Sequence, residues 1–405
     1  MARSSLDSAR EGSMDVLAAR AMTTTLRILE SVTDIPKEDW DSLLNERSSP
    51  FMAWTWLACL EESGSVCAES GWIPRPFALY EDKKLVAVAP AYVKLHSEGE
   101  FVFDWSWADV AHRMGLDYYP KLVFAVPFTP ATGERILVRE GFPREEVVRA
   151  FGEAAADLTK DLSMSGAHAL FVREDEAVAL AEAGYEERLG IQFHWKNKDF
   201  GTFEDFLTTL PSKKRTQLRR ERAQLAKDGV TITTLRPEEL DVSLARAMHE
   251  LYLTTVDKFV YGRRYLNVRF FELVAERFRD SLAWAVAKRT EDGRERIVAS
   301  AFNVKKDGVL YGRYWGTHVD LPFLHFNVCF YHGIDECIRE GLHTFEPGAG
   351  GEHKRVRGFR PTITRSAHLL HDPRLASLVR PFLDRERRAV VAHVEEDRKE
   401  YEGTE

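Results

Sequence analysis

Short apolar runs separated by polar turns dominate the first half of the chain. Alternating or continuous apolar runs of this length favour β-strands, and apolar residues at helical spacing favour helices. The strands predicted in this half are 26–32, 77–80, 85–95, 101–105, 119–126, 167–172 and 185–195, and the helices are one that begins at Ser49-Pro50 and the segments 39–46, 144–162 and 175–183.

The second half repeats this order of elements. Turns at 291–293 and 306–308 join three of its strands into an antiparallel meander. The predicted strands are 231–235, 283–288, 296–305, 309–315, 343–345 and 362–370, and the predicted helices are 211–228, 238–258, 267–278, one from Pro322 to Gly341 and one from Pro373.

Each half offers a meander, a helix, a short strand and a glycine-aromatic pair that leads into a further strand. These pairs are Gly184-Tyr185 and Gly358-Phe359. The repetition predicts two α/β units of one plan, each with a mixed, largely antiparallel sheet. The pattern breaks at 199–202, so we expect a disordered lead at 1–23, units at 24–199 and 200–395, and an acidic, frayed tail at 396–405.

Composition sets limits on the function. The 405 residues are 44% hydrophobic, which is ample for two domains, and the formal charge of −8 argues against general binding of nucleic acid. An anion site would therefore have to be local. The four cysteines form no Cys-x-x-Cys pair, no apolar run could span a bilayer, and residues 1–23 lack a signal-peptide core. We expect a cytoplasmic protein.

The segment 345–360 concentrates chemistry directly after a predicted strand. Its glycines Gly348, Gly350 and Gly351 permit backbone angles closed to other residues and let a ligand approach the main chain. A run of cations without an intervening acid follows: His353, Lys354, Arg355, Arg357 and Arg360. The segment is either an anion-binding loop, with Lys354 and Arg357 as ligand contacts, or a solvated basic turn.

Strand 309–315 supplies further candidates. Simple alternation would place Tyr311, Arg313 and Trp315 on one face. A buried unpaired guanidinium costs on the order of several kcal/mol. Arg313 is therefore expected either to line a cleft or to join an ion pair.

Two further residues complete the candidate catalytic set with Arg313. Glu346 ends the neighbouring strand and is either a base or amine anchor, or an ion-pair partner of Arg313 or Arg357. His353 has a free pKa near 7, so it could act as a base or serve as a structural hydrogen-bonding group.

The helix 211–228 holds six cations and one acid within residues 213–222. Arg215, Arg219 and Arg222 share one face at positions i, i+4 and i+7, and Lys214 is adjacent. Lys214, Arg215 and Arg219 are therefore candidate contacts for the phosphates of tRNA or of a nucleotide-linked precursor. The alternative is a solvated helix face.

Three segments of the sequence carry a resemblance to a known family. They are Asp104-Trp105-Ser106-Trp107-Ala108, residues 118–122 together with 127–135, and the glycine segment 345–360 together with its continuation through 364–368. With them the chain resembles the FemAB-like family of N-acyltransferases in the GNAT superfamily, of peptidoglycan biosynthesis/recognition type. The resemblance implies tandem GNAT-like units and transfer of an acyl or aminoacyl group to an amine, with a cell-wall precursor as one candidate acceptor. It is also the sole reason to name Tyr118, Tyr119, Lys121 and Arg135 as substrate-binding residues.

One departure bears on the donor. GNAT enzymes that use acetyl-CoA hold the pyrophosphate with a glycine-rich loop at a helix N-terminus. Here the interval 316–322 has one glycine, the carboxylate of Asp320 and Pro322, which lacks an N–H. Fem-type enzymes also lack the loop, so the resemblance implies aminoacyl-tRNA as donor. The alternatives are an acyl-CoA-dependent N-acetyltransferase and a non-catalytic protein that binds peptidoglycan or RNA.

No motif indicates a cofactor or a metal. Gly-x-Ser-x-Gly and Walker sequences are absent, and His368 and His371 have no nearby carboxylate or cysteine to complete a metal set. We expect the ligand cleft at or near the junction of the two units. Peripheral membrane contact and the oligomeric state stay open.

Overall fold

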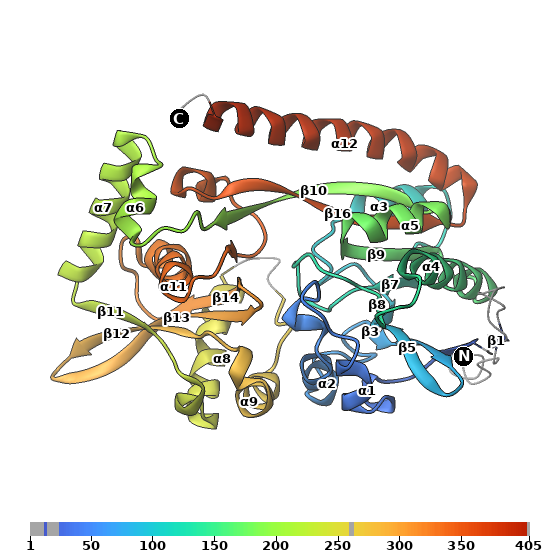
Figure 1. Cartoon of the computed structure of the whole chain (residues 1–405), viewed down its shortest axis with the longest axis horizontal. Helices are drawn as coiled ribbons and strands as arrows, with labels where there is room; N and C mark the ends of the chain where they lie inside the picture. Colours follow the sequence, from blue (N-terminus) through green and yellow to red (C-terminus); the bar gives the residue numbers. More distant parts are fainter. Residues whose placement is uncertain (1–11, 14–23, 259–262, 403–405) are drawn as a thin grey trace. The chain divides into compact units, whose positions relative to one another are not determined.

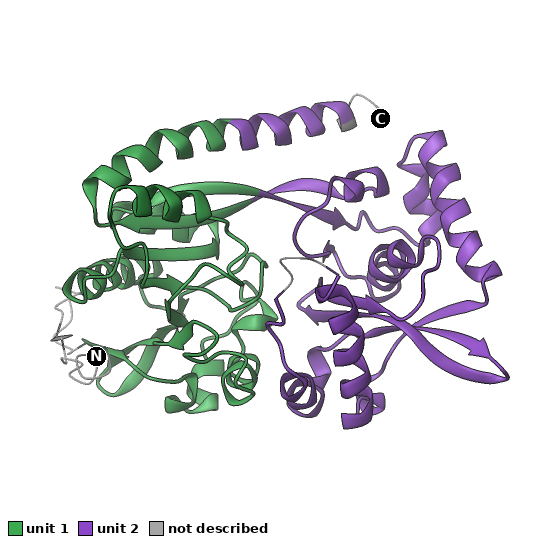
Figure 2. Ribbon diagram, turned by 180° about the vertical axis from the view of Figure 1, so that it is seen from behind, with its two compact units in different colours: residues 1–190, 364–388 green, residues 191–363, 389–405 purple. Residues whose placement is uncertain are grey.

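The chain forms two compact units, shown in a computed structural model that describes residues 12–13, 24–258 and 263–402 (Figure 1). Unit 1 comprises Met1–Gly190 and Thr364–Arg388, and unit 2 comprises Ile191–Ile363 and Ala389–Glu405 (Figure 2). The boundary expected near residue 199 lies close to the first of these borders, but the chain also returns to unit 1 at Thr364. Apart from Gly12–Ser13, the lead expected at 1–23 lies outside the described residues.

Among the described residues, unit 1 contains two sets of strands and five α-helices, besides the start of α12. Its strands are β1 (Gly12–Ser13), β2 (Thr24–Ile28), β3 (Trp72–Pro74), β4 (Phe77–Glu81), β5 (Lys84–Ala89), β6 (Ala91–Lys94), β7 (Lys121–Phe124), β8 (Leu137–Val138), β9 (Gly166–Val172) and most of β16 (Arg360–Leu370). Its helices are α1 (Lys37–Asp41), α2 (Trp54–Glu62), α3 (Trp105–Arg113), α4 (Arg144–Asp161) and α5 (Glu174–Glu182). The strand orders are β1-β2-β4-β5-β8 and β16-β9-β7-β6-β3. Only β7 and β9 pair in parallel among the described neighbours of this unit.

Unit 2 has the strand order β11-β12-β13-β14-β15-β10. The strands are β10 (Glu186–Lys196), β11 (Val230–Thr234), β12 (Ala285–Glu291), β13 (Arg294–Lys306), β14 (Val309–Thr317) and β15 (Thr344–Glu346). The helices are α6 (Phe203–Thr208), α7 (Ser212–Lys227), α8 (Val242–Val256), α9 (Val268–Arg277), α10 (Leu324–Phe326), a π-helix (Asn327–Tyr331), α11 (His332–Glu340), a 3-10 helix (Glu352–Arg357) and α12 (Pro373–Glu402), which begins in unit 1. The pair β14–β15 is parallel, and the other described pairs are antiparallel.

The two units share one plan. In each, an antiparallel meander is followed by helices and then by a strand parallel to the last meander strand, β9 beside β7 and β15 beside β14. A long strand then pairs antiparallel with that parallel strand: β16 with β9 in unit 1, and β10 with β15 in unit 2. The fold is therefore a tandem α/β arrangement with mixed, largely antiparallel sheets, which confirms the sequence prediction.

Helices cover both faces of the sheet in each unit. In unit 1, α4 and α5 pack with β6, β7 and β9 in one apolar core, and α3 packs with α12 in another. In unit 2, α6, α7 and α11 form a core with β10, β14 and β15. On the opposite face, Tyr252 of α8 contacts Tyr314 of β14 and Phe271 of α9 contacts Phe302 of β13. Such double coverage explains why the central strands are apolar on both faces.

Three expectations about elements are wrong. The strand predicted at 85–95 is two strands, because Pro90 has no N–H for a continuous ladder. Residues 101–104 form no strand, and α3 begins at Trp105. The acidic tail continues α12 as a helix through Glu402, and Asp397 within it is buried and pairs with Arg355 and Arg360.

A buried charge cluster fixes the segment between β6 and α3. Lys121, whose side chain is 1% exposed, donates from Nζ to Ser97 Oγ (3.0 Å), Glu100 Oε2 (2.9 Å) and Asp104 Oδ2 (2.5 Å). Tyr118 donates to the same Asp104 oxygen at 2.6 Å. Burial raises the pKa of Glu100 to about 7, against the opposing charge of Lys121. Burial would also raise the pKa of Asp104, but Lys121 holds it below its ordinary value.

Tyr119 and Arg135, the other residues named from the family resemblance, also form hydrogen bonds within the protein. The hydroxyl of Tyr119 lies 2.8 Å from that of Ser97. Arg135 is buried and donates to the carbonyl oxygens of Ala131 (2.6 Å), Gly133 (3.2 Å) and Leu170 (2.8 Å). These contacts give Tyr118, Tyr119, Lys121 and Arg135 structural roles, and a ligand-binding role for them stays a prediction.

The cluster predicts that replacing Lys121 destabilises the protein more than replacing Lys94, a second buried lysine nearby. Lys121→Met would leave Glu100 and Asp104 buried without their counter-charge, so we expect a loss of about 3–5 kcal/mol in the free energy of unfolding. The control is Lys94→Met, because Lys94 forms no ion pair within the described residues: it donates to the carbonyl oxygens of Gly71 and Glu98 and lies over the Trp72 ring, so its loss should cost less. Urea denaturation of both variants measures the difference. Equal losses would show that the carboxylates do not depend on Lys121.

Candidate functional site

A β-bulge in β14 reorients the end of the central strand of unit 2. Gly312 pairs with Asn303 and Tyr314 pairs with Phe302, so Arg313 has no Cα partner on β13. A bulge interrupts the alternation of side chains. The expectation that Tyr311, Arg313 and Trp315 share one face by simple alternation is therefore wrong.

Near this bulge, β14 loses β15 as a neighbour and stays paired with β13. It pairs with β15 only from Val309 to Tyr311, opposite Thr344 to Glu346, and then runs on to Thr317. The chain that follows Glu346 leaves the sheet as the glycine loop. Ligand sites in α/β proteins commonly form where neighbouring strands separate in this way.

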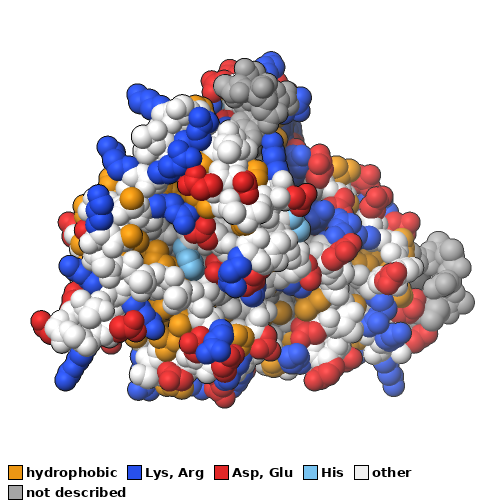
Figure 3. Space-filling model, turned by 60° about the vertical axis from the view of Figure 1, so that its left-hand side comes forward, with side chains coloured by type: hydrophobic (Ala, Val, Ile, Leu, Met, Phe, Trp, Pro, Cys, Tyr) orange, Lys and Arg blue, Asp and Glu red, His pale blue; other side chains and the backbone are white. Residues whose placement is uncertain are grey.

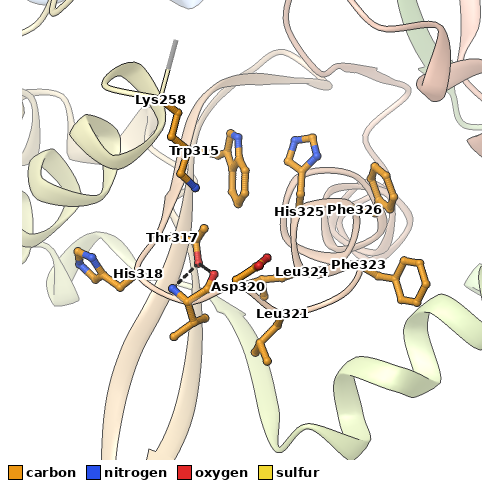
Figure 4. A pocket seen from close by; sticks show the side chains of 11 residues that line it. Lys258, Trp315, Thr317, His318, Asp320, Leu321, Phe323, Leu324, His325 and Phe326 are labelled. Atoms are coloured by element: carbon orange, nitrogen blue, oxygen red, sulfur yellow. Dashed lines mark hydrogen bonds between the residues drawn. The ribbon is translucent and has the colours of Figure 1, made fainter. Parts of the chain in front are cut away.

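A pocket of about 620 Å³ opens at the end of β14, within the size range of small-molecule sites (Figure 4). Its lining comes from β14, from the loop between β14 and α10, from α10 and from the end of α8. The lining residues are Lys258, Trp315, Thr317, His318, Val319, Asp320, Leu321, Phe323, Leu324, His325 and Phe326. All of them belong to unit 2.

The wall of the pocket is aromatic and largely neutral. The ring of His325 lies 4.4 Å from that of Trp315, centroid to centroid. Burial, assisted by nearby His353, Arg357 and Lys354, lowers the pKa of His325 to about 4. His325 is therefore uncharged at neutral pH and adds no cation to the pocket.

His353 lies beside this wall. Its ring centroid is 6.1 Å from that of His325 and 6.0 Å from that of Phe326. Burial, with help from Lys354 and Arg357, lowers its pKa below the ordinary imidazole value. The imidazole is therefore neutral at physiological pH and can accept a proton.

The glycine loop adopts the conformations that its sequence predicts. Gly348, Gly350 and Gly351 have φ values of 84°, 75° and 95°, which side chains of L-residues rarely adopt. The loop is held from beneath by buried Lys354, which donates from Nζ to the carbonyl oxygens of Gly348 (2.7 Å) and Ala349 (3.1 Å). Burial lowers the pKa of Lys354 to about 8. Lys354 thus fixes the conformation of the loop through hydrogen bonds to its backbone.

Arg357 is committed to a buried ion pair. Its guanidinium binds both carboxylate oxygens of Glu221 on α7, at 3.0 and 3.2 Å, and donates to the hydroxyl of Tyr331 at 3.0 Å. It also stacks over the ring of Phe326, which lines the pocket. Arg357, one of the two cations predicted as anion contacts, therefore joins three elements of the protein.

Arg313 and Glu346 influence each other near the point where the strands separate. Burial lowers the pKa of Arg313, and Tyr314 and Glu346 oppose this shift. A carboxylate oxygen of Glu346 lies 3.9 Å from Nδ1 of His194, whose pKa burial lowers to about 3, so that contact is not an ion pair at neutral pH. Neither Arg313 nor Glu346 lines the pocket, and their catalytic roles stay predictions.

The basic helix α7 divides its cations between internal and outward contacts. Arg219 pairs with Glu204 (2.6 Å), Arg222 pairs with Asp335 (2.9 Å), and Arg215 donates to a backbone carbonyl. Lys213, Lys214 and Arg220 form no ion pair within the described part of the chain. Figure 3, turned toward this side, shows Lys and Arg side chains interspersed with Asp and Glu.

The structure gathers only part of the predicted site. Trp315 lines the pocket, and His353, against which Gly351 of the glycine loop packs, adjoins its wall. In unit 1, Tyr118, Tyr119 and Lys121 lie around Ser97 and Asp104, whereas Arg135 binds backbone carbonyl oxygens. Sequence reasoning missed Lys258 and His325 as lining residues. Lys258 lies 57 residues before Trp315, and no local pattern links the two. Asp320 was noted only because its charge disfavours a pyrophosphate.

Comparisons with solved structures support the fold. The protein FemX superposes with a TM-score of 0.51 at 13% identity over 85% of this chain and 98% of its own. The C-terminal domain of an Agrobacterium fabrum protein named as a lysylphosphatidylglycerol synthetase gives 0.51 at 13% identity, with 84% and 94% covered. A tandem GNAT protein from the clavulanic acid biosynthesis pathway gives a TM-score of 0.45 at 11% identity, with 86% and 99% covered, and this score is too low to carry an argument. At these identities the likeness concerns the fold alone.

Two further searches complete the comparison. No curated protein sequence matches the chain. Within the described residues, none of the helices is both long and apolar enough to cross a membrane.

A family profile provides the match in sequence. The profile of FemAB-like proteins, described as peptidoglycan biosynthesis/recognition, covers residues 31–402. This range includes most of both units and every residue of the pocket. The resemblance inferred from the sequence is confirmed, and the chain belongs to the FemAB-like family.

Proposed function

We propose that the protein transfers an aminoacyl group from aminoacyl-tRNA to an amine, with a cell-wall precursor as acceptor. The observation that carries the proposal is the pocket at the end of β14, where aromatic walls adjoin a neutral imidazole and a glycine loop. The family description supports a role in peptidoglycan biosynthesis. The likeness to FemX supports the same fold plan.

The reaction needs a neutral amine, a docked donor and a proton acceptor. The amine nitrogen attacks the acyl carbonyl carbon, and the carbonyl electron pair moves to its oxygen. The tetrahedral intermediate then expels the donor's ribose oxygen, which takes up the proton lost by the nitrogen. His353 would accept that proton from the amine, because its lowered pKa keeps the imidazole free at neutral pH. Glu346 is the alternative base or amine anchor.

The choice of aminoacyl-tRNA over acyl-CoA rests on the loop between β14 and α10. Asp320 lines the pocket, and Pro322 has no N–H to offer a phosphate. A carboxylate close to a diphosphate, together with lost amide contacts, would weaken CoA binding by roughly a hundredfold. The outward cations Lys213, Lys214 and Arg220 supply phosphate contacts for RNA instead.

A donor assay tests this proposal. Purified protein is incubated with an amine-bearing muramyl peptide precursor and either tRNA charged with labelled amino acids or labelled acetyl-CoA. We expect label to pass from tRNA to the precursor and not from acetyl-CoA. His353→Gln should lower the rate by about 10²–10⁴-fold while tRNA binding is kept, as expected for the loss of a proton acceptor.

Three results would count against the proposal. Transfer from acetyl-CoA, with micromolar binding in a calorimetric titration, would establish the acyl-CoA alternative. Binding of RNA or precursor without any transfer would favour the non-catalytic alternative. A full rate in His353→Gln would remove His353 as the base and leave Glu346.

The outward face of α7 yields a prediction that depends on salt. Replacing Lys213, Lys214 and Arg220 by Ala should weaken tRNA binding at low salt and reduce the slope of log affinity against log salt by about 2–3, because each phosphate contact releases counterions. Fluorescence anisotropy with labelled tRNA over a range of salt measures this slope.

A variant of equal charge change serves as the control. It replaces Arg236, Arg246 and Arg269 by Ala; each is exposed and paired with Glu239 or Glu272. This variant should bind tRNA like the wild type. If both triple variants behave alike, the effect reflects net charge, and α7 is a solvated surface.

A further inference from the structure

Two opposite charges face the pocket from different elements. Asp320 comes from the loop after β14, and Lys258 follows α8. Figure 4 shows their side chains entering the pocket from separate sides. Among the residues that the structure describes, neither Asp320 nor Lys258 takes part in an ion pair. Both charges are therefore available to a ligand.

Among the lining residues, Asp320 and Lys258 are the side chains suited to recognise a charged ligand. His325 is neutral because burial lowers its pKa to about 4. The Thr317 hydroxyl is occupied, since its single proton is directed to the carbonyl oxygens of Val298 (3.1 Å) and Val319 (2.8 Å) and its oxygen accepts from the N–H of Val319 (3.1 Å). The side chain of His318 is directed away from the other lining groups in Figure 4. Trp315 and Phe326 supply apolar surface.

This arrangement matches a small dipolar ligand. An α-amino acid carries an ammonium and a carboxyl group on one carbon, with a side chain of variable size beside them. A carboxylate binds the first, an ammonium binds the second, and aromatic walls take up the side chain. A pocket of about 620 Å³ accommodates such a molecule with room for its side chain.

We propose that the pocket is an amino acid headgroup site, in which Asp320 binds the α-ammonium and Lys258 faces the acyl or carboxyl oxygen. The inference rests on the proposed function, because an aminoacyl donor ends in the same headgroup. It goes further in two respects. Asp320 selects an aminoacyl over a plain acyl group, and free amino acids bind and compete with the donor.

The selection has a physical basis. A plain acyl group that binds in this pocket would displace water from the exposed Asp320 carboxylate and offer it no positive partner. Sites that are built around a polar group reject analogues that lack it more strongly than apolar pockets reject a missing methylene. Asp320 therefore acts as the specificity determinant, and Lys258 positions the reacting carbonyl.

The test uses free L-amino acids and their analogues. Calorimetric titration ranks the twenty amino acids, and the tightest is compared with its des-amino acid and its des-carboxy amine. We expect each analogue to bind at least about tenfold more weakly than the amino acid, because each loses a charge-assisted hydrogen bond. Asp320→Asn should reduce amino acid affinity to that of the des-amino analogue, and Lys258→Met to that of the des-carboxy analogue.

Asp292→Asn is the matched control. It removes one exposed carboxylate of unit 2 at a turn position with φ of 51°, which Asn tolerates, and it does not line the pocket. Circular dichroism and thermal midpoints should agree among the variants and the wild type, since Asp320 and Lys258 are exposed.

The outcomes separate this inference from the proposed function. Equal binding of the three compounds, unchanged binding in Asp320→Asn, or no binding of any amino acid would overturn the headgroup site. If label transfer from tRNA persists in that case, the transferase proposal stands without it. If amino acids bind as expected but no donor is used, the headgroup site stands and the transferase proposal fails.

Discussion

The buried ion pair between Arg357 and Glu221 is the contact on which the candidate site depends. It joins α7 to the 3-10 helix that follows the glycine loop, and Tyr331 of the π-helix donates to the same carboxylate. Both charged side chains are at most 4% exposed. Removing one partner would leave an uncompensated buried charge, so the pair holds three elements in a single arrangement. Because Arg357 also covers Phe326, that arrangement sets one wall of the pocket.

The pocket follows from where the strands of unit 2 cease to pair. β15 ends at Glu346 while β14 continues to Thr317, and the Cβ that an alanine at Gly316 would carry lies 1.7 Å from the carbonyl oxygen of Leu251 on α8. Close packing on that side directs Trp315 to the other side, against His325. The desolvation of this wall keeps the His325 imidazole neutral, and the carboxylate and the ammonium of the pocket enter from separate elements.

Local patterns predicted the fold better than the site. The tandem plan, the meander turns and the positive φ of the loop glycines follow from short-range periodicity and from glycine's freedom. The bulge at Arg313 does not, because it arises from the register with β13. The partner of Arg357 was equally hidden, since Glu221 lies 136 residues earlier in the chain. A cation run therefore resembled an anion-binding loop although two of its members, Lys354 and Arg357, are buried in contacts with the protein itself.

The most direct test of the central claim is to map where the donor's acyl end docks. A short RNA with the tRNA acceptor sequence would carry an amide-linked aminoacyl group with a photoreactive diazirine side chain. After irradiation and protease digestion, mass spectrometry identifies the cross-linked peptides. The account predicts cross-links within residues 315–326, reduced by an excess of the free amino acid. Cross-links confined to unit 1, or unaffected by the amino acid, would contradict it.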